Sequence, residues 1–317
     1  MKKVINASPS YLSITKEIAQ FIYKRKSSLF KRVILLTWPF LILFFSFPIL
    51  KIINGNENID STSSGMTIFI VIAWILIWGA FCLMYIYFMR MLFFIEKVIW
   101  IDSFFDKENI SDKESFTIAK NIFIPVMKIK IKLFFNYYFM GFVFYFGVIV
   151  ICFLVGIKQN IEFLVIVSIA DLVVVGPIAL YVYFYYLDIK LRYFWFIYLD
   201  QYGTSSFSYS KIKDEMFKLN AISKGESYKK ILIMNFGISS VNAIVNVVVS
   251  ALVSNLEKLG GFEGAAGQSI KFFSEEYFNQ VDSIGKLLTK YLLYRHARAE
   301  LYPEQQIVNE RLYLLKL

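Results

Sequence analysis

Histidine and cysteine are nearly absent from this chain, which has one histidine, His296, and two cysteines, Cys82 and Cys152, in 317 residues. A single imidazole excludes a histidine-rich zinc site or an HExxH motif, and a Ser-His-Asp arrangement would have to use His296. Both cysteines fall within apolar runs. We therefore expect two free, buried thiols rather than a disulfide or a metal pair.

Motifs for catalysis are missing as well. No GxSxG turn occurs. The glycine-rich stretch GGFEGAAGQS has neither the GxxxxG spacing nor the lysine of a phosphate-binding loop. An intramembrane aspartyl protease would need a second buried acid beside Asp171, and the apolar runs offer none. These absences predict a protein that is not an enzyme and has no cofactor and no metal site.

Charged residues are scarce too. They make up 18% of the chain, while 57% is hydrophobic and 19% aromatic. A soluble domain has about 25% charged and about 45–50% apolar residues. The composition therefore predicts an all-α, polytopic integral membrane protein. A membrane helix needs roughly 20 apolar residues, and four runs are long enough: residues 33–53, 66–89, 133–157 and 163–187.

Basic residues are distributed unevenly around these runs. Residues 1–32 hold eight Lys or Arg and the loop 90–132 again holds eight, whereas residues 54–65 hold none. The positive-inside rule then places the N-terminus in the cytoplasm. Cytoplasmic loops facing anionic lipid account for the net charge of +10, so no nucleic-acid partner is expected. No signal peptide is expected, since the first apolar run begins only at Val33.

The apolar runs divide the chain into five parts. These are a basic amphipathic N-terminal segment (1–32), a transmembrane hairpin (33–89), a loop of cytoplasmic helices (90–132), a second transmembrane hairpin (133–187) and a C-terminal helical region (188–317). The first segment suits either the membrane surface or packing on the protein itself. Amphipathic helices near the C-terminus, with Ile284, Leu288 and Tyr291 on one face, are expected to pack on another subunit or another protein.

Residues 231–254 form one more apolar run, which carries a narrow polar stripe. Its members are Asn235, Ser239, Asn242, Asn246 and Ser250. Their spacing of four, three, four and four residues places all of them on one face of a helix. The pattern predicts a fifth membrane helix whose polar face lines water or bonds to neighbouring helices. A cytoplasmic helix with an exposed stripe is the alternative, and the choice decides the side of the C-terminus.

Asp171 is the one acid inside the four long apolar runs. A carboxylate at that depth costs a few kcal/mol and normally faces water, a partner or a proton. Gly176 and Pro177 follow it and give the helix a place to bend, since proline removes a backbone hydrogen bond. Two roles remain open for Asp171: a proton or cation pathway with a hinge at Gly176 and Pro177, or a structural hydrogen bond between helices.

Two classes of function follow from these observations. The favoured one is an oligomeric inner-membrane protein that forms or frames a channel-like conduit or scaffold within a larger assembly. Its pathway candidates are Asp171 and the polar stripe. The alternative is an ion- or proton-coupled secondary transporter that uses Asp171 and the Gly176-Pro177 break, although such transporters usually show two matched halves. The expected partners are the lipid bilayer, further copies of the chain and other membrane or cytoplasmic proteins, and the bias toward Lys, Ile, Phe and Asn suggests a bacterial source.

Overall fold

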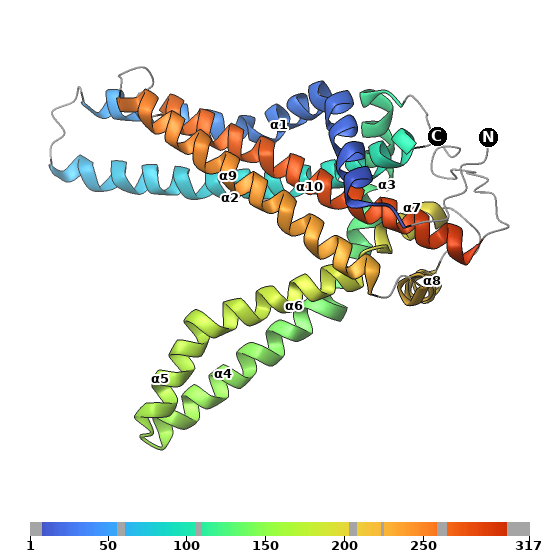
Figure 1. Ribbon diagram of the computed structural model, residues 1–317. Helices are drawn as coiled ribbons and strands as arrows, with labels where there is room; N and C mark the ends of the chain where they lie inside the picture. The colour runs from blue at the N-terminus through green and yellow to red at the C-terminus, as the bar shows by residue number, and fades with distance from the viewer. Residues whose placement is uncertain are drawn as a thin grey trace. The chain divides into compact units, whose positions relative to one another are not determined.

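The computed structural model describes residues 8–55, 61–105, 110–202, 208–222, 225–258 and 265–302. Within these ranges the chain is helical and contains no strand, which confirms the all-α prediction (Figure 1). Side chains at 41, 43–55, 61–72, 74, 75, 144, 172, 256–258 and 265 lie outside the description.

Four helical segments of the described part are long and apolar enough to cross a membrane, which supports an integral membrane protein. They are Leu76–Phe105, Asp112–Lys158, Glu162–Gln201 and Glu226–Asn255. Three of them overlap predicted runs, and the fourth overlaps the predicted fifth helix at 231–254. Residues 33–53 are helical, but most of their side chains lie outside the description. The number of crossings therefore stays a prediction.

The chain divides into two compact units. Among the described residues, unit 1 comprises those of Met1–Ala119 and Gly225–Glu304, and unit 2 comprises those of Lys120–Lys224. Unit 2 is thus inserted in the sequence between the two parts of unit 1.

Unit 1 is a bundle of long helices. They are α1 (Tyr11–Gly55), α2 (Ser61–Phe105), the beginning of α3 (Asp112–Leu133), α9 (Glu226–Lys258) and α10 (Ala265–Leu301). α1 packs on α2 and α10, and α10 also packs on α9 and α2. Figure 1 shows α9 and α10 running side by side along most of their length. α10 is therefore the helix that holds unit 1 together.

The apolar face of the N-terminal segment is covered by the protein itself. Ile14, Phe21 and Leu29 of α1 are fully buried, while Lys16 and Lys24 are exposed. A stripe of apolar residues at helical spacing packs against neighbouring helices and leaves the basic residues outside. The apolar residues near the end of α10, which were expected to pack on a partner, are likewise buried within the chain.

Unit 2 is built around a helical hairpin. After the end of α3 come a π-helical turn η1 (Phe134–Phe139), α4 (Met140–Lys158), α5 (Glu162–Ala170), a second π-helical turn η2 (Asp171–Val175) and α6 (Gly176–Lys190). α4 packs on α5 and α6. Asn160 makes the turn between α4 and α5 with a φ of 54°, a left-handed conformation that asparagine tolerates.

The outer surface of this hairpin is apolar. Phe163, Ile166, Val173 and Tyr181 are all exposed. A soluble domain rarely exposes so extensive an apolar surface, whereas lipid tails cover it without penalty. Short helices α7 (Phe194–Gln201) and α8 (Tyr209–Ile222) then pack on each other and complete the unit.

Candidate functional site

The polar stripe of α9 is turned toward α10. Ser239 Oγ donates a hydrogen bond to Asp282 Oδ1 at 3.1 Å, and Asn242 Nδ2 donates to Asn279 Oδ1 at 3.1 Å. The residue numbers rise along α9 as they fall along α10, so the two helices are antiparallel. We call this contact the α9–α10 polar interface; it consists of Asn235, Ser239, Asn242 and Asn246 of α9 and Asn279, Asp282 and Lys286 of α10.

An ion pair lies at the centre of the α9–α10 polar interface. Asp282 Oδ2 is 2.7 Å from Lys286 Nζ, one helical turn further along α10, and the Asp282 side chain is only 14% exposed. Its other oxygen accepts the hydrogen bond from Ser239. Both carboxylate oxygens are therefore satisfied, which a charge shielded from water requires.

The asparagines extend the interface toward the end of α9. Asn246 Nδ2 donates to Asn242 Oδ1 at 3.4 Å, which continues the series of amide contacts. Asn235 is 5% exposed, and within the described part of the chain no donor reaches its Oδ1 or the Oδ1 of Asn246. Ser250, the last residue of the predicted stripe, is half-buried. α9 therefore holds two buried amide oxygens whose hydrogen-bonding capacity is unused within the described part of the chain.

The opposite face of α9 is apolar and exposed. Phe236 is 74% exposed, Ile244 64% and Val247 70%. A helix with its polar groups against a neighbour and its apolar groups outside suits lipid surroundings. The cytoplasmic alternative requires the reverse orientation, with the polar stripe outside.

α10 presents polar groups to α2 as well. Arg90 pairs with Glu276, with the nitrogen and oxygen 2.5 Å apart, and Gln280 donates to Glu276 from the next turn. Lys97 Nζ donates to Gln280 Oε1 at 3.0 Å and to Ser283 Oγ at 2.7 Å. α10 is thus polar toward two helices, which explains why its sequence is less apolar than that of α9.

A buried charge network joins α1, α2 and α3. Arg32 binds Glu96 through two hydrogen bonds of 2.8 and 2.7 Å, and the Glu96 side chain is fully buried. Ser115 Oγ also donates to Glu96, and Trp100 Nε1 donates to Ser115 Oγ, both at 2.9 Å. No sequence signal suggested this network, because its members are far apart along the chain and belong to no motif.

A second arginine of α1 lies beside this network. Both terminal nitrogens of Arg25 donate to the carbonyl oxygen of Ile110 at 3.2 Å, and its guanidinium lies 3.6 Å from Asp112. Burial lowers the pKa of Arg25, and the neighbouring Asp112 and Glu96 carboxylates oppose that shift. The guanidinium stays protonated at any physiological pH, since an arginine does not lose its proton in a protein.

Asp171 belongs to unit 2 and begins the π-helical turn η2. Its carbonyl oxygen accepts hydrogen bonds from the backbone N–H of Gly176 and from Tyr145 Oη, the latter at 2.8 Å. Its carboxylate is half-buried, and in the ranges described no side chain bonds to it or forms an ion pair with it. The interhelical hydrogen bond at this residue is thus made by its backbone and not by its acid.

Glycine and tyrosine fit together twice in the hairpin. The Tyr145 hydroxyl occupies the place that a side chain on Gly176 would take, since a Cβ there would lie 1.4 Å from it. In the opposite direction, the Tyr183 ring lies 2.7 Å from the Cβ position of Gly141 and its hydroxyl donates to the carbonyl oxygen of Tyr137 at 2.8 Å. Each tyrosine therefore donates a hydrogen bond to a backbone carbonyl in the opposite arm of the hairpin: Tyr145 of α4 to η2, and Tyr183 of α6 to η1.

Gly176 and Pro177 begin α6 directly after η2, with proline in the first turn. Figure 1 shows a change of direction where α5 passes into α6. Pro177 has no N–H to donate to the preceding turn, so a widened turn is accommodated at this point.

The remaining sequence candidates take part in no such arrangement. Cys82 is buried, Cys152 is half-buried, and both are free thiols. The His296 side chain is 15% exposed, and its Nε2 lies 4.0 Å from a carboxylate oxygen of Glu300. Comparison with known protein families, curated proteins and solved structures finds no match for this chain. Fold and composition alone define its class, a helical integral membrane protein.

Proposed function

We propose that the protein is a non-enzymatic, oligomeric component of a bacterial inner membrane that forms or frames a conduit, with the α9–α10 polar interface as the polar path. One observation carries the proposal: α9 turns a face of amides and hydroxyls toward the ionisable Asp282 of α10, and it turns an apolar face outward. Polar groups held in that position within a membrane protein commonly mark an ion or proton pathway.

The chemistry of the interface suits a cation or a proton. Asp282 supplies a carboxylate, and the amides supply carbonyl oxygens, two of which have no donor within the described residues. Such oxygens are satisfied by water or by an incoming cation.

Ion flux through liposomes containing the purified protein tests this proposal. Wild-type protein is compared with Asp282→Asn and Asn242→Leu, which change the interface, and with Val247→Leu, which changes only the exposed face of α9. We expect flux from the wild type and from Val247→Leu, and at least a tenfold loss in the two interface variants. No flux from any of the four well-folded proteins would leave a scaffold role; equal flux from all four would place the path elsewhere.

The inner-membrane location and the cytoplasmic N-terminus belong to the same proposal. The basic residues before Val33 and in the loop after Met89 support that orientation. Oligomerisation is inferred only from the proposed function. A conduit must be enclosed by helices on all sides, and the helices of one chain are too few to enclose it. Crosslinking in native membranes tests it, and a purely monomeric protein would contradict it.

An ion-coupled transporter that uses Asp171 is the second candidate. It is favoured by the half-buried Asp171 carboxylate, which has no side-chain partner in the described ranges, beside a widened helical turn. Asp171→Asn should then abolish proton-coupled uptake at unchanged yield, while Glu162→Gln at the exposed turn of the hairpin should not. Unchanged uptake in Asp171→Asn would remove this candidate.

A further inference from the structure

Exposed lysines gather near the base of the helical hairpin of unit 2. Exposed apolar side chains cover the two arms of the hairpin between Phe134 and Tyr186. The end of α3 and the helix α8 lie beyond this apolar part. They carry five exposed lysines that form no ion pair within the described part of the chain: Lys128, Lys132, Lys211, Lys213 and Lys218. We call these five residues the basic collar.

Two contacts hold α8 at the base of the hairpin. In the first turn of α8, the centre of the Tyr209 ring lies 4.5 Å from Lys132 Nζ. In the last turn, Asn220 Nδ2 donates a hydrogen bond of 3.0 Å to the carbonyl oxygen of Lys190, the last residue of α6. α8 is therefore tied to α3 at one end and to α6 at the other, so the collar is part of the same packed unit as the hairpin.

The lysines of α8 lie on its outward face. Three apolar residues on its inner face are buried: Ile212, Met216 and Leu219. Lys211 and Lys218 are two helical turns apart and therefore lie on one side of the helix. Lys213 lies on the other flank, with its Nζ 5.8 Å from the centre of the exposed Phe217 ring. Since Asp214 is the one exposed acid of α8, the outward face is predominantly basic.

The direction of α8 suits the surface of a membrane. Figure 1 shows α8 nearly end-on, whereas α4 and α6 of the same unit run lengthwise in the picture. α8 therefore runs crosswise to the hairpin. Both arms of the hairpin belong to segments long and apolar enough to span a bilayer, so an inserted hairpin stands along the membrane normal. A helix that runs crosswise at its base then lies along the surface, at the level of the lipid headgroups.

We propose that the basic collar binds the headgroups of anionic phospholipids in the leaflet that surrounds the base of the hairpin. The negative surface potential of such a leaflet attracts lysines next to a membrane helix. Lipid is the partner that this position favours, because the apolar arms that lipid tails cover continue directly into the collar. Asp188 and Asp214 are exposed nearby and offset the charge only in part. The proposal concerns unit 2 and does not depend on the conduit proposed above.

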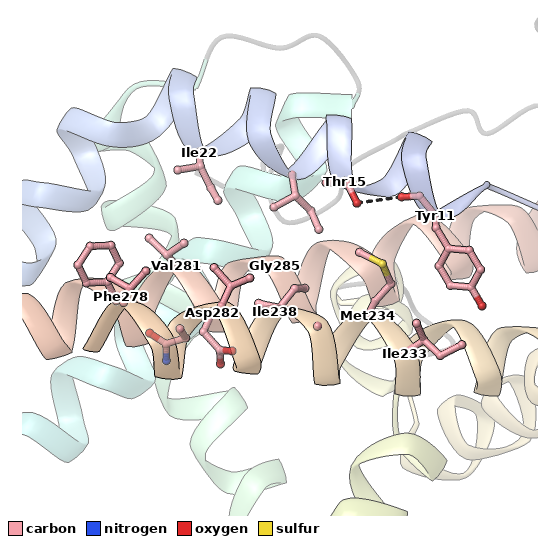
Figure 2. Close-up of a pocket in the computed structure, with 15 residues that line it drawn as sticks. Tyr11, Thr15, Ile22, Ile233, Met234, Ile238, Phe278, Val281, Asp282 and Gly285 are labelled. Atoms are coloured by element: carbon pink, nitrogen blue, oxygen red, sulfur yellow. Dashed lines mark hydrogen bonds between the residues drawn. The ribbon is translucent and has the colours of Figure 1, made fainter. Parts of the chain in front are cut away.

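The N-terminal part of α1 provides a matched control. Figure 2 shows Ile22 of α1 and the α10 residues Phe278 and Val281 directed toward the same space, so α1 turns its apolar side into the bundle. This part of unit 1 also carries three exposed lysines that form no ion pair within the described residues: Lys16, Lys24 and Lys31. Removing three lysines from α1 or from α8 changes the net charge by the same amount, so a difference between the two variants depends on position.

Native mass spectrometry of the whole chain, extracted from vesicles of equal phosphatidylglycerol and phosphatidylcholine, measures the preference for the anionic lipid. The collar variant carries three substitutions in α8: Lys211→Gln, Lys213→Gln and Lys218→Gln. The control variant carries three in α1: Lys16→Gln, Lys24→Gln and Lys31→Gln. We expect the wild type and the control to prefer phosphatidylglycerol equally, and the preference of the collar variant to be roughly tenfold weaker. No preference in the wild type, or an equal loss in both triple variants, would overturn the proposal.

A second variant tests the α3 part of the collar and serves if the α8 variant fails to fold. Lys128→Gln combined with Lys132→Gln should weaken the preference for phosphatidylglycerol roughly fivefold, because two of the five lysines are lost. An unchanged preference in this double variant would also contradict the collar.

A crosslinker on α8 identifies the partner directly. Ala221 is exposed on the outward face of α8. A benzophenone amino acid at this position should capture phosphatidylglycerol ahead of phosphatidylcholine, and less of it at about 1 M salt, which screens exposed charges. Equal capture of the two lipids, or capture of protein or nucleic acid in place of lipid, would overturn the proposal.

Discussion

Glu96 is the residue whose surroundings differ most from those expected of a carboxylate. It is fully buried, bound by both hydrogen-bonding nitrogens of Arg32, and bonded to Ser115. Removing one partner of such a pair leaves the other charge buried without compensation, which is much more unfavourable than the absence of the pair altogether. The network fixes how α1, α2 and the start of α3 meet.

Glu96→Gln should therefore destabilise the protein strongly. We expect a loss of about 3 kcal/mol, the range for breaking a buried ion pair, measured as a lower midpoint of thermal unfolding in detergent. Glu226→Gln is the control, since the Glu226 side chain is exposed and its ion pair with Lys230 contributes little to stability. Equal midpoints for the two variants would contradict the assigned role of Glu96.

Spacing along the sequence places the stripe residues of α9 on one face, because 3.6 residues per turn is a property of the helix alone, and two of them, Ser239 and Asn242, bond to α10. The residues that meet the stripe, Asn279 and Asp282, were not predicted. Which residues of α10 lie opposite the stripe depends on the axial register of the two packed helices, and the periodicity of either sequence does not determine this register. Arg32 and Glu96 were missed for the same reason, since they are distant in sequence and only the packed bundle brings them together.

Two tyrosines, one on each arm, stabilise the helical hairpin of unit 2 by contacting the opposite arm. Tyr145 of α4 fits over Gly176 and bonds to the Asp171 carbonyl, and Tyr183 of α6 fits over Gly141. In a membrane, hydrogen bonds between helices contribute on average about 0.6 kcal/mol and at most about 2 kcal/mol. Each tyrosine ring also packs closely against a glycine of the opposite arm, and a larger residue in place of the glycine would prevent this contact.

Tyr145→Phe and Gly176→Ala should act on the same contact. Each should lower stability by about 1 kcal/mol, and the double variant should lose clearly less than the sum, because a methyl group at 176 already displaces the hydroxyl. A double-mutant cycle of unfolding midpoints measures the coupling. Gly147→Ala, with open space around it, should be neutral or slightly stabilising. Additive losses would show that the two residues act independently.

The sequence indicated a bend at Gly176 and Pro177, because proline has no N–H to donate. It gave no sign that the turn before the proline is π-helical or that a tyrosine from another helix bonds to it. Backbone propensity depends on the local residue, whereas the partner Tyr145 is supplied by the fold of the hairpin.

At the scale of the whole molecule, the antiparallel pairing of α9 and α10 determines on which side of the membrane the end of α10 lies. Both helices are long, 33 and 37 residues, and at 1.5 Å per residue each extends about 50 Å, more than the thickness of a bilayer. If α9 crosses the membrane, α10 returns alongside it, with Glu276 paired to Arg90 of α2 and Asp282 bonded to Ser239 of α9.

A reporter fused after Leu301 should therefore lie on the same side of the membrane as one inserted between α8 and α9. We expect both to be cytoplasmic, as judged by fluorescence of a cytoplasm-active fusion and by inactivity of a periplasm-dependent phosphatase. Opposite sides for the two fusions would mean that only one of the two helices crosses.

The insertion of unit 2 into unit 1 has a consequence for biosynthesis. α2 leaves the ribosome long before α10, which supplies the acceptors Gln280 and Ser283 for Lys97 and the carboxylate of Glu276 for Arg90. At about 5–20 residues per second, the intervening chain takes about ten to thirty-five seconds to synthesise. During that interval the first hairpin must be held with its polar face away from lipid, so this protein should depend on an insertase or chaperone to a degree that its finished structure does not reveal.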